Sequence, residues 1–513
     1  MTSSLIRDTT SDERALPILV AIVGAGVMGR GIARVLAQGG VDVLLHDARE
    51  GVAAQAAVDM HHELQAAVSM GRLSGAAAGD AMSRVQVATA LSDLRHATVV
   101  IEAIVEELAA KQALFGALEE IVNETCVLAT NTSSLSVTAI AAACTTPQRI
   151  IGLHFFNPVP AMRLVEVIDG LRTHASVGVA MLALAQRVGH TAVRVRDTPG
   201  FLVNHAGRGY GTEALRIVGE SVAEPHAVDT ILRAQAGFRL GPFDLFDLVG
   251  LDVSVPVMES VYRQFWDEPR FRPSPILVQR RAAGLLGAKS GEGFYRHENG
   301  RRIPMPVTAP PRVEAGVVWV SSAEPVLADA ARTLLRSLGA RIETGAAPSV
   351  GATCIVTPVG EDVTTCAVRE QLDATRSVAL DMLFSNAAHS TLMLSPLTTA
   401  KVRAQMESLL STNGHGVSTI ADSAGLVAQR VVAMIVNIAC DIAQQRIAAT
   451  PDIDLAVTLG LGYPHGPLAW GDLLGPRIVE RVLLNMHALS GDPRYRVSPW
   501  LRRRAALRVS LRA

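Results

Sequence analysis

A glycine-rich loop near the start of the chain constrains the fold more than any other feature. Gly24-Ala25-Gly26-Val27-Met28-Gly29 follows an apolar run at 18–23 and leads directly into a helical pattern at 27–38. In this context Gly24 permits a tight turn, Gly26 lets the backbone approach a pyrophosphate, and Gly29 lets helix and strand pack closely. The helix N-terminus supplies amide donors for phosphates. The pattern predicts a dinucleotide-binding α/β domain; the alternative is a glycine-rich turn that binds no ligand.

A second apolar run at 41–45 ends in His46-Asp47, and Asp47 lies 23 residues after Gly24. An acidic side chain at this position accepts hydrogen bonds from the adenosine ribose hydroxyls, and its charge repels a 2′-phosphate. We therefore expect NAD rather than NADP as the cofactor. Arg49 follows closely enough to weaken this preference slightly.

The N-terminal part of the chain alternates short apolar runs with Ala-rich helical stretches, which is typical of a parallel sheet. Further strands are predicted at 98–101 and 126–129. Residues 48–88 form an insertion whose apolar positions recur at helical spacing, and they predict a helical hairpin that projects from the sheet. Residues 1–196 are thus interpreted as a Rossmann-type NAD-binding domain.

Two later segments of the chain repeat one another. The matched features are 197–204 with 422–429, Gly241-Pro242 with Gly466-Pro467, and 268–272 with 492–496. All three occur in the same order in both copies. We therefore predict two related helical domains, at 197–296 and 415–513.

Residues 297–414 separate the two copies. They begin with a Pro-rich linker at 303–311 and continue with strand-like runs at 316–320 and 353–357 around a helical stretch at 327–338. No glycine loop occurs here, so we interpret the segment as a spacer, a decayed Rossmann-like half. The predicted fold is an α/β Rossmann-type NAD-binding domain plus duplicated all-α C-terminal domains, joined by a small α/β spacer.

The composition argues against several classes of protein. Lys+Arg at 47 and Asp+Glu at 48 balance, whereas a nucleic-acid-binding protein usually has a basic excess. Five scattered cysteines without a CxxC pair indicate reduced thiols rather than a disulfide framework. No apolar stretch of ~20 residues runs without polar interruption, so a membrane span is not expected. Residues 1–17 are interpreted as a frayed leader without a secretory signal, and the expected location is cytoplasmic.

Other chemistries have little support in the sequence. His61-His62-Glu63 is followed by no histidine one helical turn later, so no metal site is expected there. Arg502-Arg503-Arg504 is interpreted as the charged face of a C-terminal helix. A GxSxG elbow is absent, which argues against serine hydrolysis.

One histidine and one glutamate each interrupt an otherwise apolar run. His154 and Glu166 lie on either side of the turn Asn157-Pro158-Val159-Pro160, and an antiparallel hairpin would bring them opposite or diagonal to one another. A carboxylate beside an imidazole in a dry site raises its basicity and fixes its orientation, as a general base near neutral pH requires. We predict a catalytic dyad; the alternatives are a structural histidine and a charge at a strand edge.

Five motifs in this order and spacing resemble the 3-hydroxyacyl-CoA dehydrogenase family over about residues 18–296. They are Asn131-Thr132-Ser133-Ser134-Leu135, Gly152-Leu153-His154-Phe155-Phe156-Asn157-Pro158, Leu164-Val165-Glu166-Val167, Thr198-Pro199-Gly200-Phe201 and Lys289-Ser290-Gly291-Glu292-Gly293-Phe294. With its spacer and second helical copy, the whole chain resembles the long bacterial form, which includes the 3-hydroxybutyryl-CoA and 3-hydroxyadipyl-CoA dehydrogenases of phenylacetate breakdown. The resemblance implies NAD-dependent oxidation of a (3S)-3-hydroxyacyl-CoA to a 3-oxoacyl-CoA, as in fatty-acid β-oxidation.

The resemblance also implies roles for individual residues. His154 would be the general base, and Glu166 would orient it and stabilise its imidazolium form. Ser133 would bond the reacting oxygen or the cofactor, and Asn204 would hold the substrate carbonyl. Positions that match NAD contacts in the family are Glu106, Lys111, Asn157 and Lys289. Alternatives stay open for two residues, because Lys111 could pair with Glu107 on a solvated helix face and Ser133 could cap the next helix.

The acyl-CoA substrate would meet the chain at the helical insertion and at Ser133 and Asn204. Arg72 is the basic residue that the insertion offers to the CoA phosphates, whereas Met70 stands where many relatives carry a second basic residue. The chain also has His205 after Asn204, where the family usually has Arg. Both departures replace basic residues that the family pattern would place near the CoA phosphates.

The second copy lacks the functional residues of the first. Gln429 replaces Asn204, Ala424 replaces Pro199, and no glycine loop precedes them, so one active site per chain is predicted. Because the helical domain forms a dimer interface in shorter members of the family, the second copy could supply that contact internally; a homodimer between chains is left open. Two alternatives for the function remain: a short-chain 3-hydroxy acid dehydrogenase that acts without CoA, and a non-catalytic NAD-binding structural protein.

Overall fold

The computed structural model describes residues 18–305, 312–386 and 388–513. The predicted leader at 1–17 and most of the predicted linker at 303–311 therefore lie outside the described residues. The chain forms two compact units, residues 1–197 and 198–513, each of which is described by itself. The predicted division into four domains is finer than these two units, and it stays a prediction.

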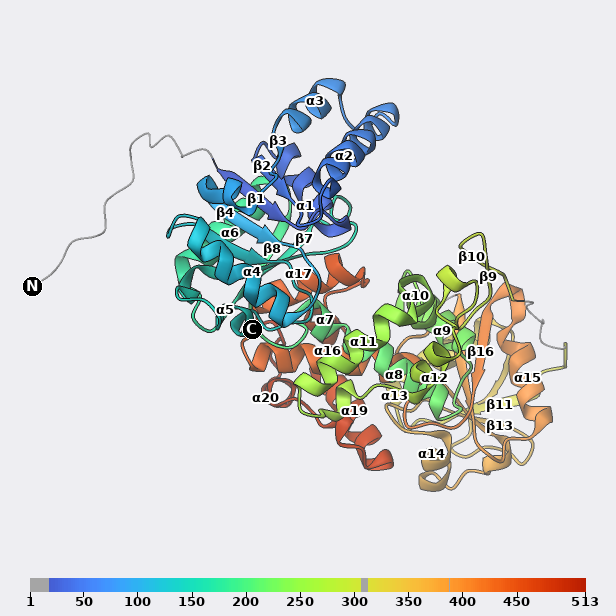
Figure 1. Ribbon diagram of the computed structural model, residues 1–513. Helices are drawn as coiled ribbons and strands as arrows, with labels where there is room; N and C mark the ends of the chain where they lie inside the picture. Colours follow the sequence, from blue (N-terminus) through green and yellow to red (C-terminus); the bar gives the residue numbers. More distant parts are fainter. Residues whose placement is uncertain (1–17, 306–311, 387) are drawn as a thin grey trace, which may run out of the picture. The chain divides into compact units, whose positions relative to one another are not determined.

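The first unit contains a sheet of eight strands within its described residues, in the order β3-β2-β1-β4-β5-β6-β7-β8 (Figure 1). Only β6 and β7 pair antiparallel among these strands; the other neighbours are parallel. The strands are β1 Leu19–Val23, β2 Asp42–His46, β3 Val85–Val87, β4 Val99–Glu102, β5 Val127–Thr130, β6 Ile150–Phe155, β7 Leu164–Asp169 and β8 Thr191–Arg196. This arrangement, followed by a largely helical second unit, confirms the predicted Rossmann-type fold class.

Helices cover both faces of this sheet, because successive strand residues point to opposite sides. Val20 and Ile22 of β1 pack in a core with residues of α1, α2, α3 and α6. Ala21 and Val23 pack in a second core with residues of α4 and α5. The helices are α1 Val27–Gln38, α2 Val52–Ser69, α3 Gly75–Ser83, α4 Leu108–Ile121, α5 Val137–Ala141 and α6 Ala175–Arg187.

The insertion between β2 and β4 forms the predicted helical hairpin, α2 and α3. Its last residues differ from the prediction, because Val85–Val87 form the edge strand β3 and pair with β2. Only one residue of this short strand is partly buried and the other two are exposed, so it carries too little apolar pattern to be recognised in the sequence. Glu63 on α2 pairs with Arg34 at 2.9 Å and with Arg30 at 3.3 Å, which ties the hairpin to α1.

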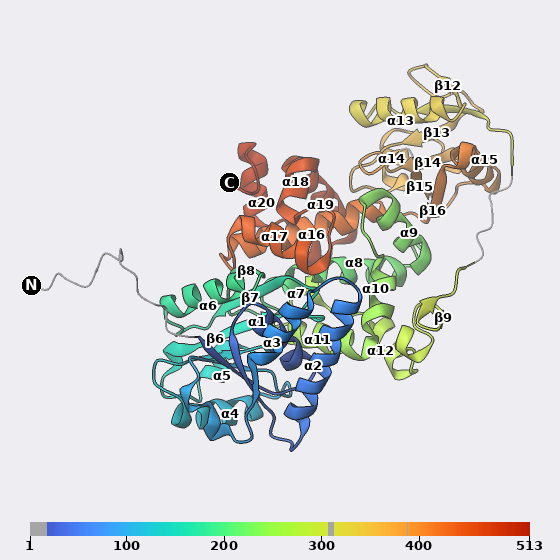
Figure 2. The same ribbon diagram turned by 90° about the horizontal axis from the view of Figure 1, so that it is seen from above.

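The second unit begins and ends with helices and contains a second sheet (Figure 2). The helices before the sheet are α7 Val203–Ala206, α8 Arg208–Gly219, α9 Pro225–Ala236, α10 Pro242–Val249, α11 Leu251–Gln264 and α12 Pro275–Ala282. Those after it are α16 Val427–Gln444, α17 Thr450–Leu461, α18 Pro467–Leu474, α19 Pro476–Ser490 and α20 Pro499–Leu507. A short hairpin, β9 His297–Glu298 with β10 Arg301–Arg302, lies between the first helices and the sheet.

The second sheet has six strands in its described part, in the order β12-β11-β13-β14-β15-β16, and β14 and β15 are its antiparallel pair. The strands are β11 Val317–Val320, β12 Arg341–Glu343, β13 Thr353–Val356, β14 Ser377–Leu380, β15 His389–Leu394 and β16 Gly416–Ile420; α13 Pro325–Ser337, α14 Val363–Arg369 and α15 Ala400–Leu410 connect them. The series β13-α14-β14-β15-α15-β16 repeats β5-α5-β6-β7-α6-β8 of the first sheet. This topology supports the interpretation of the spacer as a decayed Rossmann-like half.

Two side-chain contacts recur at the same places in both sheets. Asp197 accepts hydrogen bonds from the amides of Val137 and Thr138 at the start of α5. Asp422 likewise accepts from the first two amides of α14, at 2.8 and 3.3 Å. In each sheet an arginine also donates to two carbonyls. Arg149, just before β6, binds two carbonyls that precede β5, and Arg376, just before β14, binds two carbonyls that precede β13. The internal repeat therefore extends upstream of the helical copies.

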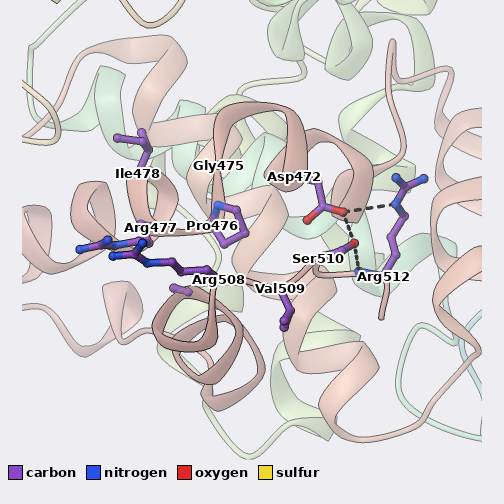
Figure 3. A pocket seen from close by; sticks show the side chains of 10 residues that line it. Asp472, Gly475, Pro476, Arg477, Ile478, Arg508, Val509, Ser510 and Arg512 are labelled. Carbon is purple, nitrogen blue, oxygen red and sulfur yellow. Dashed lines mark hydrogen bonds and ion pairs between the residues drawn. The ribbon is translucent and has the colours of Figure 1, made fainter. Parts of the chain in front are cut away.

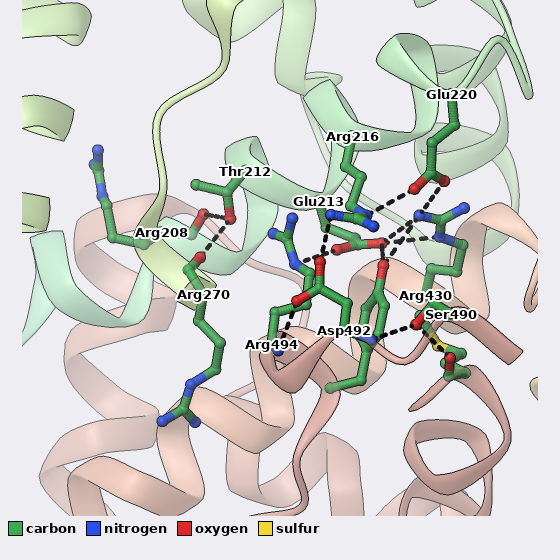
Figure 4. Close-up of polar contacts among 12 residues, drawn as sticks. Arg208, Thr212, Glu213, Arg216, Glu220, Arg270, Arg430, Ser490, Asp492 and Arg494 are labelled. Carbon is green, nitrogen blue, oxygen red and sulfur yellow. Dashed lines mark hydrogen bonds and ion pairs between the residues drawn. The ribbon is translucent and has the colours of Figure 1, made fainter. Parts of the chain in front are cut away.

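A buried charge cluster joins the two helical copies (Figure 4). Glu213 on α8 is fully buried, and it accepts hydrogen bonds from Arg430 Nε of α16 at 2.8 Å and from the Tyr495 hydroxyl at 2.9 Å. Two further ion pairs join the copies. Arg216 of the first copy pairs with Asp492 of the second copy at 2.7 Å, and Arg270 of the first copy pairs with Asp441 of the second copy.

Within the described residues α16 is the one helix long and apolar enough to cross a membrane by length and composition, and 89% of it is buried inside the structure. It packs against α8, α9, α18, α19 and α20. Its apolar length is thus accounted for by its central place among the helices.

We expect Glu213→Gln to lower the free energy of unfolding of the second unit by about 3 kcal/mol, because the variant leaves the buried Arg430 guanidinium without its main carboxylate. Urea unfolding of the full chain measures the change. Glu259→Gln is the matched control, since Glu259 pairs at 3.5 Å with an exposed arginine and should change stability by no more than about 0.5 kcal/mol. Equal effects of the two variants would contradict a structural role for the buried cluster.

Candidate active site

The glycine loop between β1 and α1 has the geometry of a phosphate-binding turn. Gly24 has a φ of 102° and donates from its amide to the His46 carbonyl at 2.8 Å. A Cβ at Gly29 would lie 1.8 Å from the Gly24 carbonyl oxygen, whereas a Cβ at Gly26 would meet nothing within 4 Å. Gly24 and Gly29 are therefore required by the turn itself, and the open space at Gly26 is the space a pyrophosphate needs.

Asp47 follows the last residue of β2, and its carboxylate is tied to the glycine loop. It accepts hydrogen bonds from the Ala25 amide at 3.0 Å and from the Arg49 amide and Nε at 3.0 and 3.2 Å. Partial burial raises the pKa of Asp47, but these hydrogen bonds and the Arg49 charge outweigh burial and lower it below the ordinary value. The side chain is therefore ionised at neutral pH, as repulsion of a 2′-phosphate requires.

His154 and Glu166 form a buried pair on adjacent strands. His154 of β6 lies directly opposite Glu166 of β7, and its Nδ1 is 2.6 Å from Glu166 Oε2. His154 is 5% exposed and Glu166 is fully buried. The prediction that the hairpin brings the two side chains together is confirmed. Asn131, in the loop after β5, accepts from the Phe155 amide at 2.8 Å and so fixes the backbone beside His154.

The loop that carries Ser133 is held by Glu106. One Glu106 oxygen accepts from the amides of Ser133 and Ser134 at 3.0 and 3.1 Å and from the Thr132 hydroxyl at 2.5 Å. Burial opposes ionisation of Glu106, but the Lys111 ammonium and these hydrogen bonds outweigh it and lower the pKa. The alternative that Ser133 caps the next helix is wrong, because Ser136 caps α5 through a bond from the Ala139 amide.

Lys111 lies in a buried ion pair. Its Nζ is 2.5 Å from Glu102 at the end of β4 and 3.2 Å from Glu106, and its side chain is 1% exposed. Glu102 also accepts from the Thr130 hydroxyl of β5 at 2.7 Å. The alternative that Lys111 pairs with Glu107 on a solvated face is therefore wrong. Sequence reasoning missed Glu102, although a glutamate at the end of a wholly apolar strand is a signal that could have indicated it.

The remaining candidates take no part in these contacts. Asn157 lies exposed in the turn after β6, and Arg72 lies exposed between α2 and α3. Asn204 and Lys289 belong to the second unit; Asn204 is partly buried on α7, and Lys289 pairs with Asp252 at 2.9 Å. Their predicted contacts with cofactor and substrate stay predictions.

His205 follows Asn204 and is fully packed. Its ring lies 4.8 Å from the ring of Phe265 and 5.2 Å from that of Phe271. Burial and the nearby Arg270 and Arg208 charges lower the pKa of His205 to about 3. The residue is therefore neutral at physiological pH and supplies no charge for a CoA phosphate.

The repeat of the sheet contains a counterpart of the His154 position. Asp381 directly follows β14 and bonds through its amide to the Thr391 carbonyl, so Asp381 and Thr391 stand where His154 and Glu166 stand in the first sheet. Gln429 reaches Asp381 at 3.0 Å and accepts from the Gly360 amide at 2.9 Å. Burial raises the pKa of Asp381 to about 6. This place holds no histidine–carboxylate pair, which agrees with a single site per chain.

The described residues contain no group of three or more His, Cys, Asp or Glu side chains that could hold a metal ion. The chemistry available is that of a dinucleotide fold with a histidine–carboxylate pair at its strand ends.

Comparison with known proteins identifies the class. Residues 19–198 match the NAD binding domain of 3-hydroxyacyl-CoA dehydrogenase, and residues 200–297 and 425–510 match its C-terminal domain. The chain is 37% identical to 3-hydroxyadipyl-CoA dehydrogenase of Escherichia coli (strain K12), over 95% of this chain and 97% of that protein. It therefore belongs to the 3-hydroxyacyl-CoA dehydrogenase family, an NAD-dependent class of oxidoreductases, and the predicted resemblance and cofactor are confirmed.

Two further relatives differ in how much of this chain they match. The crystal structure of 3-hydroxybutyryl-CoA dehydrogenase from Escherichia coli K12 matches with a TM-score of 0.84 and 36% identity, over 96% of this chain and 99% of that one. A probable 3-hydroxybutyryl-CoA dehydrogenase of Bacillus subtilis (strain 168) is 39% identical, but it covers 54% of this chain, with 97% of its own length aligned. The chain thus shares the longer, duplicated form with the first of these relatives.

We expect Lys111→Met to destabilise the first unit by about 3 kcal/mol or more, because Glu102 would remain buried without its cation. The loop at 132–134 should loosen with it, so NAD affinity should fall as well. Thermal unfolding and NADH titration by fluorescence measure the two effects. Lys401→Met, which removes an exposed lysine of the second unit, is the control, and a Lys111 variant that behaves like it would contradict the buried pair.

Proposed function

We propose that this chain oxidises the 3-hydroxyl of a (3S)-3-hydroxyacyl-CoA to the 3-oxoacyl-CoA with NAD, with His154 as the general base. The observation that carries the proposal is the buried His154–Glu166 pair, with 2.6 Å between nitrogen and oxygen, in a family member with an intact dinucleotide loop. A solvated or unpaired histidine would not serve the same chemistry.

Glu166 determines which nitrogen of His154 reacts. A carboxylate accepts a hydrogen bond and so keeps the proton on Nδ1. Nε2 is then the nitrogen that takes the proton from the 3-hydroxyl. Because both side chains are buried, the imidazolium that forms is stabilised by Glu166 rather than by water.

The glycine loop and Asp47 would hold the dinucleotide, the phosphates at the N-terminus of α1 and the adenosine ribose at Asp47. No side chain caps α1 among the described residues, so its first amides suit a phosphate. NAD, when bound, accepts the hydride that leaves C3 of the substrate.

Ser133 and Asn204 are proposed to contact the reacting part of the substrate, Ser133 at its 3-oxygen and Asn204 at the thioester carbonyl. Glu106 supports the first role, because it holds the Ser133 amide at 3.0 Å and thereby orders the loop. The role of Asn204 is carried over from the family pattern.

Arg72 is proposed to bind a CoA phosphate from the exposed turn between α2 and α3. The remaining NAD contacts, at Glu106, Lys111, Asn157 and Lys289, are carried over from the family pattern. A cytoplasmic location and dimerisation between chains stay predictions.

The substrate class is tested by NADH formation with 3-hydroxybutyryl-CoA, 3-hydroxyadipyl-CoA and free 3-hydroxybutyrate. We expect turnover of one or both CoA esters and at least about 100-fold lower kcat/KM for the free acid, since binding of the CoA part contributes several kcal/mol to catalysis. Turnover of the free acid alone would identify a dehydrogenase that acts without CoA. No turnover of any of them, together with tight NADH binding, would favour a non-catalytic protein.

We expect His154→Gln to reduce kcat by about 100- to 10,000-fold while NADH affinity stays unchanged, because the variant removes the base and leaves the dinucleotide loop intact. Glu166→Gln should also reduce kcat, since the imidazolium that forms in the reaction loses its counter-charge. His96→Gln removes an exposed histidine of the same unit and is the control. A His154 variant with full activity would overturn the assignment of the base.

A further inference from the structure

The second helical copy contains a pocket of about 470 Å³ between the start of α19 and the residues after α20 (Figure 3). Three of its lining residues are arginines, at 477, 508 and 512, and one is an aspartate, Asp472. Pro476, Ile478 and Val509 add apolar wall. The volume lies in the range of pockets that bind small organic ligands.

The positive charges in this pocket are only partly neutralised. Asp472 accepts hydrogen bonds from Ser510 Oγ at 2.5 Å, from the Leu511 amide at 2.7 Å and from Arg512 Nε at 3.3 Å. Neither Arg477 nor Arg508 has a carboxylate partner among the described residues, and Figure 3 shows both side chains toward the same side of the pocket. Two of the three arginines that line the pocket thus have no carboxylate partner in the described structure.

The helix terminus at the pocket adds to this positive potential. α19 begins at Pro476 after Gly475, and neither an acidic residue in its first turn nor a side-chain cap offsets its dipole. Pro476 has no amide hydrogen, and the Ile478 and Val479 amides donate to the Gly475 carbonyl at 2.9 and 3.2 Å, so the donor that this turn offers is the Arg477 amide. In place of an acidic residue, the first turn presents Arg477.

The other helical copy shows that the fold does not require this charge. Gly250 and Gly475 precede α11 and α19 with similar positive φ values, 95° and 91°. The second residue of the following helix is Asp252 in the first copy, paired with Lys289 at 2.9 Å, and Arg477 in the second. Asp247 and Asp472 also play the same part: Asp247 accepts from the amides of Phe294 and Tyr295, and Asp472 accepts from the amide of Leu511. The position that belongs to a neutral ion pair in the first copy is thus occupied by a positively charged residue in the second.

We propose that this pocket binds an organic phosphate outside the catalytic site. The guanidinium groups of Arg477 and Arg508 and the Arg477 amide at the start of α19 would hold the phosphate, since guanidinium groups and helix N-terminal amides are the groups that proteins use for phosphate oxygens. Ile478, Val509 and Pro476 would contact the organic part. A mononucleotide phosphate fits this combination of charge, apolar wall and volume.

The test is isothermal titration calorimetry of the full chain, saturated with NADH so that the dinucleotide loop is occupied. The probes are AMP, adenosine 3′,5′-bisphosphate, adenosine and inorganic phosphate. We expect a nucleotide site that the pocket variants below remove, and at least about tenfold weaker binding of adenosine there, because it lacks the charge. Tighter binding of the bisphosphate would identify the nucleotide end of CoA as the ligand, and tighter binding of AMP a free mononucleotide.

Arg477→Asp, which installs the residue of the first copy, and Arg508→Gln should each weaken nucleotide binding at least about tenfold. Dehydrogenase activity and the melting temperature should stay unchanged, and Arg503→Gln, an exposed arginine of α20 outside the pocket, should have no effect. The proposal is overturned if the NADH-saturated chain binds no nucleotide at millimolar concentration, or if both pocket variants bind as the unmodified chain does. Equal affinity for AMP and inorganic phosphate would overturn the part assigned to the apolar wall.

Discussion

The structure around His154 depends on the buried ion pairs of Lys111. The Lys111 ammonium is balanced by Glu102 at the end of β4 and by Glu106, whose second role is to hold the amides of the loop after β5. An unpaired charge in such a place would be strongly destabilising, so these residues can be arranged in few other ways. The same loop reaches the strand of the dyad through Asn131 and the Phe155 amide. The backbone beside His154 is thus supported by a salt bridge between α4 and the end of β4.

The duplication shows which parts of this arrangement the fold needs. The contacts that satisfy backbone groups occur in both sheets: an aspartate that caps a helix, and an arginine that binds two carbonyls. Buried backbone groups must be paired in any copy of the fold, and these contacts are accordingly retained. Side chains that do not pair with buried backbone groups can differ between the two copies. Asp381 and Thr391 stand at the places of His154 and Glu166, and Arg477 stands at that of Asp252. The first copy has the buried His154–Glu166 pair, and the second has the arginine-lined pocket.

Much of the site was predictable because it rests on short periods in the sequence. The glycine spacing predicted the turn, and the symmetric spacing of His154 and Glu166 about Pro160 predicted that they lie opposite or diagonal to one another; they lie opposite. The predictions of individual contacts failed for polar side chains that are buried in the folded protein. Lys111 lies on a helix with charged neighbours, and nothing in its spacing distinguishes a solvated position from one that faces Glu102. The cap of α5 was assigned to Ser133 as an alternative, although Ser136 makes it, because several serines follow one another there.

The sequence by itself determined the class of fold, the cofactor, the pairing of the dyad and the relation between the two helical copies. These features depend on the types of residues and on their spacing along the chain, and both can be read from the sequence. Only the tertiary structure decided where the charges go: Lys111 between two carboxylates, Glu213 against Arg430, and Arg477 without a carboxylate partner in the described structure. The physical reason is that a charge is stabilised by whatever side chain the folded backbone brings within a few ångströms. Those partners come from other elements of the fold, 217 residues away in the case of Glu213 and Arg430.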